Sequence, residues 1–349
     1  MKIAVYTITK NEEKFIKRWA ESCQEADYRL IVDTGSTDGT VYEALANGCE
    51  VSSITVRPWR FDDARNAALA LLPDDIDYCI ALDADEVLAD GWRSFFDNLD
   101  PTITRPRYKY VWSWNSDDSE GLVYSGDKIH ARHGYRWKHP VHEVIKPVGI
   151  EKQGWIGLEI HHYPDDTKSR SQYLPLLEIA VAEDPNDDRN RFYLGREYMF
   201  NNMKEKAAEH LLKHLELSQW RPERATAMRY LSRVTDDKFP WLLKACAESP
   251  DRREPWVELA TFYYFHKKWT QCLAALENAL DIKEKPLEYL CEALSWGAYP
   301  YDLATISAWN IGMLDKAIEY CQIALSLEPN NSRFAGNLQL LLEHNSKIL

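Results

Sequence analysis

Strand-like and helix-like patterns of hydrophobic residues take turns at the start of the chain. Segments rich in β-branched and other apolar residues, typical of strands, cover 2–8, 28–32, 51–56 and 78–82. Between them, apolar residues recur at the spacing of one helical face, as in Phe15, Ile16 and Trp19. Helices are accordingly expected near 15–23, 41–46 and 61–72. Strands that alternate with helices predict a parallel α/β sheet.

The pattern changes at about Arg107. Four aromatic residues then alternate with other side chains at the period of a strand, and we call them the aromatic ladder: Tyr108, Tyr110, Trp112 and Trp114. The segment 121–133 is typical of a further hairpin, and 155–161 of a last strand. The first half of the chain is therefore expected to end as a mixed sheet.

From about Asp165 onward the sequence is helical in character. Paired amphipathic segments recur at 191–201 with 205–217, 256–265 with 270–282, and 304–313 with 315–327. The spacing is roughly that of tetratricopeptide (TPR) arrays, and 315–330 resembles the second helix of such a repeat. A single helical hairpin cannot bury its apolar face, so the pairs are expected to stack as a solenoid. Two domains follow, at 1–165 and 166–349.

The composition is that of a globular protein. The chain has 349 residues, of which 45% are hydrophobic, and its 13 Trp and 19 Tyr supply large core side chains. A net charge of -13 argues against general nucleic-acid binding, which needs a basic face. The seven cysteines form no C-x-x-C pair and fit a reducing compartment. With no signal peptide and no apolar run of membrane-spanning length, we expect a cytoplasmic protein.

Three carboxylates follow the buried segment 78–82 at once, namely Asp83, Asp85 and Glu86. On an extended backbone, Asp83 and Asp85 would point to the same side. Two neighbouring carboxylates repel each other unless a cation neutralises them. Oxygen ligands suit Mg²⁺ or Mn²⁺, and ligands bind at the carboxyl ends of strands in α/β sheets. A metal site is therefore expected here, and the alternative is a solvated acidic loop.

Four motifs in order carry a resemblance to a known family: 7–12 (TITKNE), 33–40 (DTGSTDGT), 61–66 (FDDARN) and 82–86 (LDADE). Together they resemble family 2 glycosyltransferases of the GT-A nucleotide-sugar fold, most of all a subgroup with a TPR-like tail. The later pairs His142-Glu143 and His162-Tyr163 also match that subgroup. The resemblance covers roughly residues 1–165.

The resemblance implies roles for residues near the nucleotide. Thr7 and Thr9, at the end of the first strand, would face the base, and Asp33 would accept the N3–H of uracil. The alternative for Asp33 is a turn or helix N-cap residue. Arg65 would pair with the pyrophosphate or with the acidic cluster. Its alternative is an ordinary ion pair. Asp83 would contact ribose and metal.

Further roles concern the metal and the acceptor. Asp85 would ligate the cation, and Glu86 would be a supporting or structural residue. His162, or less favourably His161, would add a nitrogen ligand, since neighbours on a strand point to opposite faces. The alternative is a buried, hydrogen-bonded histidine. Glu143 would be the general base, with His142 beside it as a second catalytic candidate. A structural His-Glu pair is the alternative.

The motifs and the acidic cluster thus predict a metal-dependent glycosyltransferase that moves a sugar from a nucleotide sugar, with UDP favoured, to an acceptor hydroxyl. The family resemblance further implies that the transfer inverts the anomeric configuration. A glycan, a lipid-linked sugar or a protein could be the acceptor. The aromatic ladder is expected to pack in the core rather than to stack on a sugar. The helical array shows no cluster of His, Asp or Glu at ligand spacing, so we expect an accessory surface for a partner, such as another protein.

Two alternatives remain open. The first is a scaffold in which the helical array binds a partner and the N-terminal domain is silent. The intact acidic cluster argues against it, because a silent site has no need to keep repelling carboxylates together. The second is a sugar nucleotidyltransferase, which would need a Gly-rich basic loop after the first strand. Residues 7–13 contain no such loop.

Overall fold

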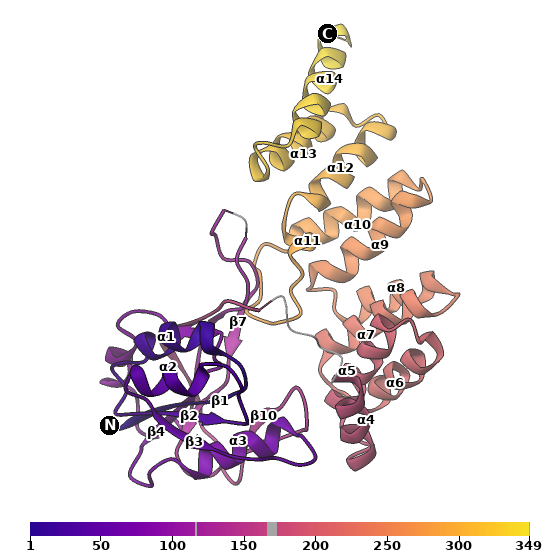
Figure 1. The fold of residues 1–349 in the computed structure, drawn as a ribbon. Coiled ribbons are helices and arrows are strands. Elements are labelled where there is room, and N and C mark those ends of the chain that lie inside the picture. The colour runs from indigo at the N-terminus through magenta and orange to yellow at the C-terminus, as the bar shows by residue number, and fades with distance from the viewer. Residues whose placement is uncertain (116, 166–172, 349) are drawn as a thin grey trace. The chain divides into compact units, whose positions relative to one another are not determined.

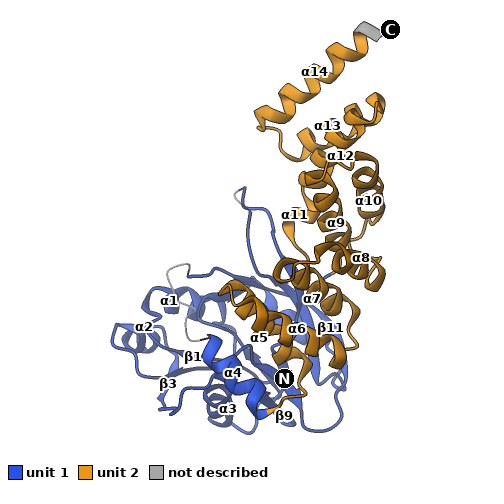
Figure 2. Cartoon of the chain, turned by 90° about the vertical axis from the view of Figure 1, so that its right-hand side faces the viewer, with its two compact units in different colours: residues 1–183, 287–289 blue, residues 184–286, 290–349 orange. Residues whose placement is uncertain are grey.

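The computed structural model describes residues 1–115, 117–165 and 173–348, and these form two compact units. Unit 1 comprises the described residues of 1–183 together with 287–289, and unit 2 those of 184–286 and 290–349 (Figure 2). The expected domain boundary, 165/166, borders residues 166–172, which lie outside the described residues. The compact units divide between Glu183 and Asp184.

The first sheet of unit 1 has five strands in the order β3-β2-β1-β4-β8. Their bounds are β1 Ile3–Thr9, β2 Tyr28–Asp33, β3 Glu50–Ser53, β4 Tyr78–Ala81 and β8 Ile129–Ala131. The pairs β1–β2, β1–β4 and β2–β3 are parallel, and β8 runs antiparallel to β4. The parallel α/β sheet predicted from the alternating pattern is therefore present, with one antiparallel edge strand added.

Helices cover both faces of this sheet (Figure 1). They are α1 Glu13–Ser22, α2 Thr40–Ala46 and α3 Phe61–Ala70. On one face, Ile16 and Trp19 of α1 are fully buried in a core with the sheet and α2. On the other face, Ala68 of α3 packs in a second core. Each helix thus buries the stripe of residues that recurs at helical spacing.

A second sheet continues unit 1 in the order β5-β11-β6-β7, and β9 and β10 form a separate pair. The bounds are β5 Glu86–Leu88, β6 Arg105–Val111, β7 Val123–Gly126, β9 Tyr135–Lys138, β10 Val144–Pro147 and β11 Gln153–His162. A short 3₁₀ helix, η1, spans Trp92–Phe96 between β5 and β6. The mixed sheet expected for this half of the chain is therefore confirmed, although β5, β9 and β10 were not predicted.

The hairpin predicted at 121–133 is wrong. β7 pairs with β6 in the second sheet, whereas β8 belongs to the first sheet and pairs with β4. The alternation of apolar and polar residues predicts where strands lie but not which strands pair. The chain passes from the second sheet to the first after Gly126, the last residue of β7. A Cβ at Gly126 would lie 2.2 Å from the ring of Tyr108, so only glycine allows this close passage.

The helical part of the chain begins with α4 Tyr173–Glu183, which belongs to unit 1. Unit 2 contains α5 Asp188–Phe200, α6 Lys204–Leu217, α7 Arg221–Val234, α8 Lys238–Glu248, α9 Arg253–Phe265, α10 Trp269–Asp281, α11 Ala293–Trp296, α12 Tyr299–Asn310, α13 Leu314–Leu327 and α14 Ser332–Ile348. Successive long helices pack on one another, and α5, α7, α9 and α12 also contact in turn. This stacked-pair architecture is that of TPR structures, as predicted.

The pair α7 and α8 was missed in the sequence. A proline usually marks the end of a helix, but Pro222 lies in the first turn of α7, where a missing N–H costs no hydrogen bond. None of the helices in the described ranges combines the length and hydropathy that a bilayer crossing requires.

Candidate functional site

The acidic cluster lies in a tight turn rather than on an extended strand. β4 ends at Ala81, and the amide of Glu86 donates to the carbonyl oxygen of Asp83 at 2.9 Å. The expectation that Asp83 and Asp85 point to one side because of an extended backbone is therefore wrong. The turn directs the two carboxylates to different partners: Asp83 contacts Arg65 and Lys128, and Asp85 faces His162.

Asp83 is held by two cations. Its Oδ1 accepts from a terminal nitrogen of Arg65 and its Oδ2 from Lys128 Nζ, both at 2.6 Å. Burial opposes the charge of Asp83, but Arg65 and Lys128 outweigh it and hold the pKa of this carboxyl well below its usual range. Asp83 is thus an anion whose two oxygens are both engaged by the protein.

Lys128 is a residue of this site that sequence reasoning missed. It lies just before β8, where the amide of Ala81 donates to its carbonyl oxygen at 3.1 Å. Its Nζ reaches Glu86 Oε1 at 2.7 Å as well as Asp83. Burial would lower the pKa of Lys128, but Asp83 and Glu86 raise it well above its usual value. No local sequence signal marks Lys128, because the antiparallel pairing of β8 with β4 brings it here.

Glu86 lies beneath the turn as a buried supporting residue, 1% exposed. Its Oε2 accepts from the amide of Asp83 at 2.8 Å, and its Oε1 accepts from the hydroxyl of Tyr110 at 2.5 Å. Burial, and secondly the charge of Asp83, raise the pKa of Glu86. These contacts agree with the supporting role expected for Glu86.

His162, and not His161, faces the acidic turn. Its Nε2 lies 3.5 Å from Asp85 Oδ2, and its Nδ1 contacts the carbonyl oxygen of Trp112 at 2.9 Å. Burial disfavours the imidazolium, but the contacts to Asp85 and to the Trp112 carbonyl outweigh it and raise the pKa of His162. His161 instead contacts Glu159, with its Nε2 at 3.3 Å from Oε2.

The Asp85–His162 pair fits a divalent cation. Since Nδ1 of His162 faces a carbonyl oxygen, that nitrogen carries the N–H and leaves the lone pair of Nε2 on the side of Asp85. A carboxylate oxygen and an imidazole nitrogen suit Mn²⁺, and Mg²⁺ accepts the carboxylate. Asp83 fits less well as a direct ligand, because Arg65 and Lys128 occupy its two oxygens.

Arg65 joins Glu143 to the acidic turn. Its Nε donates to Glu143 Oε1 at 2.5 Å, and its guanidinium lies 4.8 Å from the ring centre of Trp137. Glu143 is thus an ion-pair partner of Arg65 as well as a candidate base. Beside it, His142 has a backbone φ of +51°, and its ring makes an edge contact with Tyr173 of α4 at 5.4 Å.

Thr9 and Asp33 end the neighbouring strands β1 and β2 and are paired in register. Asp33 accepts from the amides of Gly35 at 3.0 Å and Ser36 at 3.1 Å, so it does act as a turn residue. The Oγ1 of Thr9 is buried, and no hydrogen-bond partner for it lies among the described residues. The hydroxyl of Thr7 donates to the carbonyl of Ile8 at 3.3 Å. The Thr9 hydroxyl therefore fits contact with a bound molecule.

Unit 2 also holds a group of ligand-type side chains, which corrects the expectation that its helices carry none. Atoms of Asp188, His214 and Glu223 lie within 4.8 Å of one another. His214 is fully buried, and its Nδ1 contacts the carbonyl oxygen of Asp188 at 2.9 Å. The three residues come from different helices, so sequence spacing could not reveal them.

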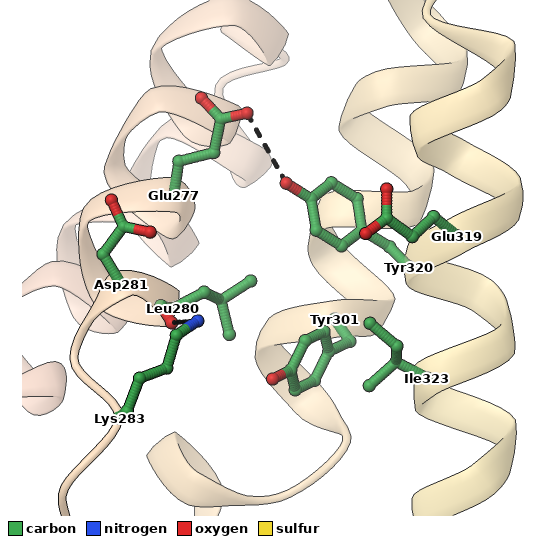
Figure 3. A pocket seen from close by; sticks show the side chains of 8 residues that line it. All are labelled: Glu277, Leu280, Asp281, Lys283, Tyr301, Glu319, Tyr320 and Ile323. Atoms are coloured by element: carbon green, nitrogen blue, oxygen red, sulfur yellow. Dashed lines mark hydrogen bonds between the residues drawn. The ribbon is translucent and has the colours of Figure 1, made fainter.

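A cavity of about 440 Å³ lies between α10, α12 and α13 of unit 2 (Figure 3). Its lining is Glu277, Leu280, Asp281, Lys283, Tyr301, Glu319, Tyr320 and Ile323. Glu277 Oε1 accepts from the Tyr320 hydroxyl at 3.5 Å, and Lys283 Nζ donates to the carbonyl of Leu280 at 2.6 Å. The lining carries three carboxylates and one ammonium, and one of these carboxylates, Glu277, is also paired with Lys316, so the lining stays acidic by about one charge.

Comparisons with known proteins concern the two units separately. The model of the family described as glycosyl transferase family 2 matches residues 4–94. No curated protein sequence matches the chain. Among solved structures, MamA is similar at 20% identity with a TM-score of 0.37, and the alignment covers 49% of this chain and 99% of MamA.

Two further solved structures are similar to parts of the chain. Yeast Tom70 aligns at 16% identity with a TM-score of 0.37, covering 52% of this chain and 38% of Tom70. Glucosyl-3-phosphoglycerate synthase from Mycobacterium tuberculosis aligns at 25% identity with a TM-score of 0.27, covering 31% of this chain and 44% of that enzyme. That structure is a complex with Mn²⁺, UDP-glucose and phosphoglyceric acid.

Proposed function

Because residues 4–94 form a glycosyl transferase family 2 domain, as the sequence motifs indicated, we propose that this glycosyltransferase is a cation-dependent, inverting enzyme that uses a UDP-sugar. The family implies a nucleotide-sugar donor. The proposed dependence on a cation rests on the Asp85–His162 pair, whose side chains could bind a divalent cation. Next to this pair, Asp83 forms ion pairs with Arg65 and Lys128.

The donor would lie across the carboxyl ends of β1, β2 and β4. The buried hydroxyl of Thr9 and the carboxylate of Asp33 would contact the base, with Thr7 supporting the end of β1. Asp83 would contact the ribose. Asp85 and His162 would hold Mn²⁺ or Mg²⁺, which when bound supplies positive charge for the leaving diphosphate.

The chemistry proposed is a single displacement at the anomeric carbon. The acceptor oxygen forms a bond to that carbon while the bond to the diphosphate oxygen breaks, and UDP leaves. The proton of the acceptor hydroxyl passes to Glu143, whose Oε2 is the oxygen left for it because Oε1 is engaged by Arg65. Arg65 links this base to Asp83 and so fixes the acceptor side relative to the donor side.

The helical unit would serve as an accessory surface for a partner. The acidic lining of the cavity between α10, α12 and α13 favours a partner segment with basic side chains. The acceptor itself would be a glycan, a lipid-linked sugar or a protein, and its hydroxyl is the reacting group.

A donor-hydrolysis panel tests the proposed function. Released nucleotide is measured for a set of nucleotide sugars with and without Mn²⁺, for the native chain, Asp85→Asn and Asp90→Asn. Asp90 is an exposed carboxylate of the same segment and serves as the matched control. We expect Mn²⁺-dependent turnover of a UDP-sugar, a loss of roughly 100- to 1,000-fold in Asp85→Asn, and native turnover in Asp90→Asn. Unchanged turnover in a folded Asp85→Asn variant would exclude the proposed role of this carboxylate.

A further inference from the structure

The aromatic ladder is divided by the end of strand β6. Tyr108 and Tyr110 are buried in the core of unit 1, as expected. β6 ends at Val111, and the next ladder residue, Trp112, is 37% exposed. Core packing therefore explains the first half of the ladder but not Trp112, which presents part of a large apolar side chain to solvent.

Trp112 lies beside the proposed cation pair. Its carbonyl oxygen contacts His162 Nδ1 at 2.9 Å, and its ring centre is 5.8 Å from the imidazole, tilted by 31°. The other edge of that imidazole is 3.5 Å from Asp85. The backbone of Trp112 thus orients the nitrogen ligand, while its partly exposed indole lies beside the imidazole of the proposed cation pair.

The topology places Trp112 on the side of the site away from the nucleotide. Thr9 and Asp33 end strands of the first sheet, whereas Trp112 follows β6 of the second sheet. The acidic turn after β4 leads into strand β5, which is part of the second sheet. In that sheet β5 pairs with β11, and β11 pairs with β6. A molecule in contact with Trp112 and the anomeric centre would therefore approach from the acceptor side.

We propose that Trp112 is a stacking platform for a pyranose ring of the acceptor, so that the acceptor of this enzyme is a carbohydrate. This inference rests on the proposed function. A sugar ring has an apolar C–H face, and the electron-rich face of an indole attracts such C–H groups.

Sugar binding by matched variants tests this inference. Methyl glycosides of the common pyranoses are titrated into the full chain in the presence of UDP and Mn²⁺, and saturation-transfer NMR reports binding. The proteins are the native chain, Trp112→Ala, Trp112→Phe and Trp155→Ala. Trp155 is an exposed tryptophan of β11, 53% accessible, and is the control. At least one glycoside should bind the native chain, with affinity falling tenfold or more in Trp112→Ala and less in Trp112→Phe.

Two further measurements separate donor from acceptor. The affinities of UDP and of the UDP-sugar identified in the hydrolysis panel are compared between native protein and Trp112→Ala. We expect both to stay within about twofold, because the ring contacts the acceptor. A selective loss of UDP-sugar affinity would place the stacked ring on the donor and overturn the inference. Equal glycoside binding by Trp112→Ala, an equal loss in Trp155→Ala, or no glycoside binding by the native chain would also overturn it. Retained UDP-sugar hydrolysis in the same preparations would leave the proposed function standing.

Discussion

Arg65 connects the two halves of the site through a single side chain. Its guanidinium is buried and contacts the carboxylates of Asp83 and Glu143 at the same time. A planar guanidinium presents several N–H groups in a fixed fork, which lysine cannot reproduce. Replacement of Arg65 would remove the cation that the partly buried carboxylates of Asp83 and Glu143 share, so its loss is expected to damage the fold of the site and not only donor binding.

Glu143 is the residue whose proposed role as general base is tested most directly by one substitution. In Glu143→Gln, the amide keeps the size of the side chain but cannot accept the acceptor proton. We expect the transfer rate to fall by roughly 10²- to 10⁴-fold, the usual range for a positioned base, with UDP-sugar affinity nearly unchanged. Rate and affinity are measured on the same preparation, and Glu21→Gln on an exposed face of α1 is the control.

The contact with Arg65 sharpens the interpretation of that experiment. If UDP-sugar affinity falls together with the transfer rate, Glu143 acts mainly by holding Arg65 against Asp83. If neither quantity changes, the base lies elsewhere, and His142 would be examined next.

Individual residues of the site could be predicted where a local rule applied. Strand alternation predicts that only one of the two neighbouring histidines faces the acidic cluster, and His162 faces Asp85 while His161 contacts Glu159. The strand rule failed at the acidic cluster, because β4 ends before Asp83 and a turn begins. Lys128 could not be found from the sequence, since it reaches the site through pairing between distant strands.

At the scale of elements, β8 shows how one edge strand serves both site and core. Its pairing with β4 brings Lys128 to the acidic turn and places His130 in the interior. His130 contacts the hydroxyl of Tyr6 at 3.2 Å and the carbonyl oxygen of Ala131 at 2.8 Å. Burial lowers the pKa of His130 to about 4, so the imidazole is neutral in the folded protein at neutral pH.

This buried imidazole predicts a pH-dependent stability. The unfolded histidine, with an ordinary pKa of about 6.5, takes up a proton before the folded one does as pH falls. His130 should therefore favour folding fully above pH 6.5 and progressively less down to about pH 4. Between pH 7 and pH 5, the native chain should lose about 2 kcal/mol more unfolding free energy than His130→Gln. Urea denaturation at both pH values measures the difference, and equal losses in the two proteins would contradict it.

The elements themselves could be predicted better than their partners. β1, β2 and the three helices of the first sheet follow directly from hydrophobic periodicity. The partner of β8 is β4, a strand far from it in sequence, and periodicity does not encode such a pairing. In the helical unit, Pro222 lies in the first turn of α7, and because a proline can end one helix or begin the next, the sequence pattern alone does not reveal α7.

At the scale of the whole chain, unit 1 is not continuous in sequence. Leu287–Tyr289 belongs to it, and the amide of Ser125 in β7 donates to the carbonyl of Leu287 at 3.1 Å. The ring of Tyr289 lies 6.4 Å from that of Tyr124. Helix α4 belongs to unit 1 as well. Unit 1 thus includes α4 and Leu287–Tyr289, which a division of the sequence at the start of its helical pattern would assign to unit 2.

Two truncated chains test whether α4 is part of unit 1. One ends at Asp165 and the other at Asn186, so that only the longer retains α4, with the contacts of Tyr173 to His142 and Glu183 to Arg60. An aromatic contact and a partly exposed ion pair together contribute roughly 1–2 kcal/mol, which corresponds to a melting temperature about 2–8 °C higher for the longer chain. Both lack Leu287–Tyr289, so the difference between them reports on residues 166–186, which include α4. We expect the longer chain to bind UDP with Mn²⁺ as the full chain does, because Thr9, Asp33, Asp85 and His162 all lie before residue 166. Calorimetry on the folded truncations measures binding.

Two outcomes would contradict these expectations. Equal melting temperatures would mean that α4 does not stabilise unit 1. Loss of UDP binding by a folded 1–186 chain would mean that residues beyond 186 contribute to the donor site.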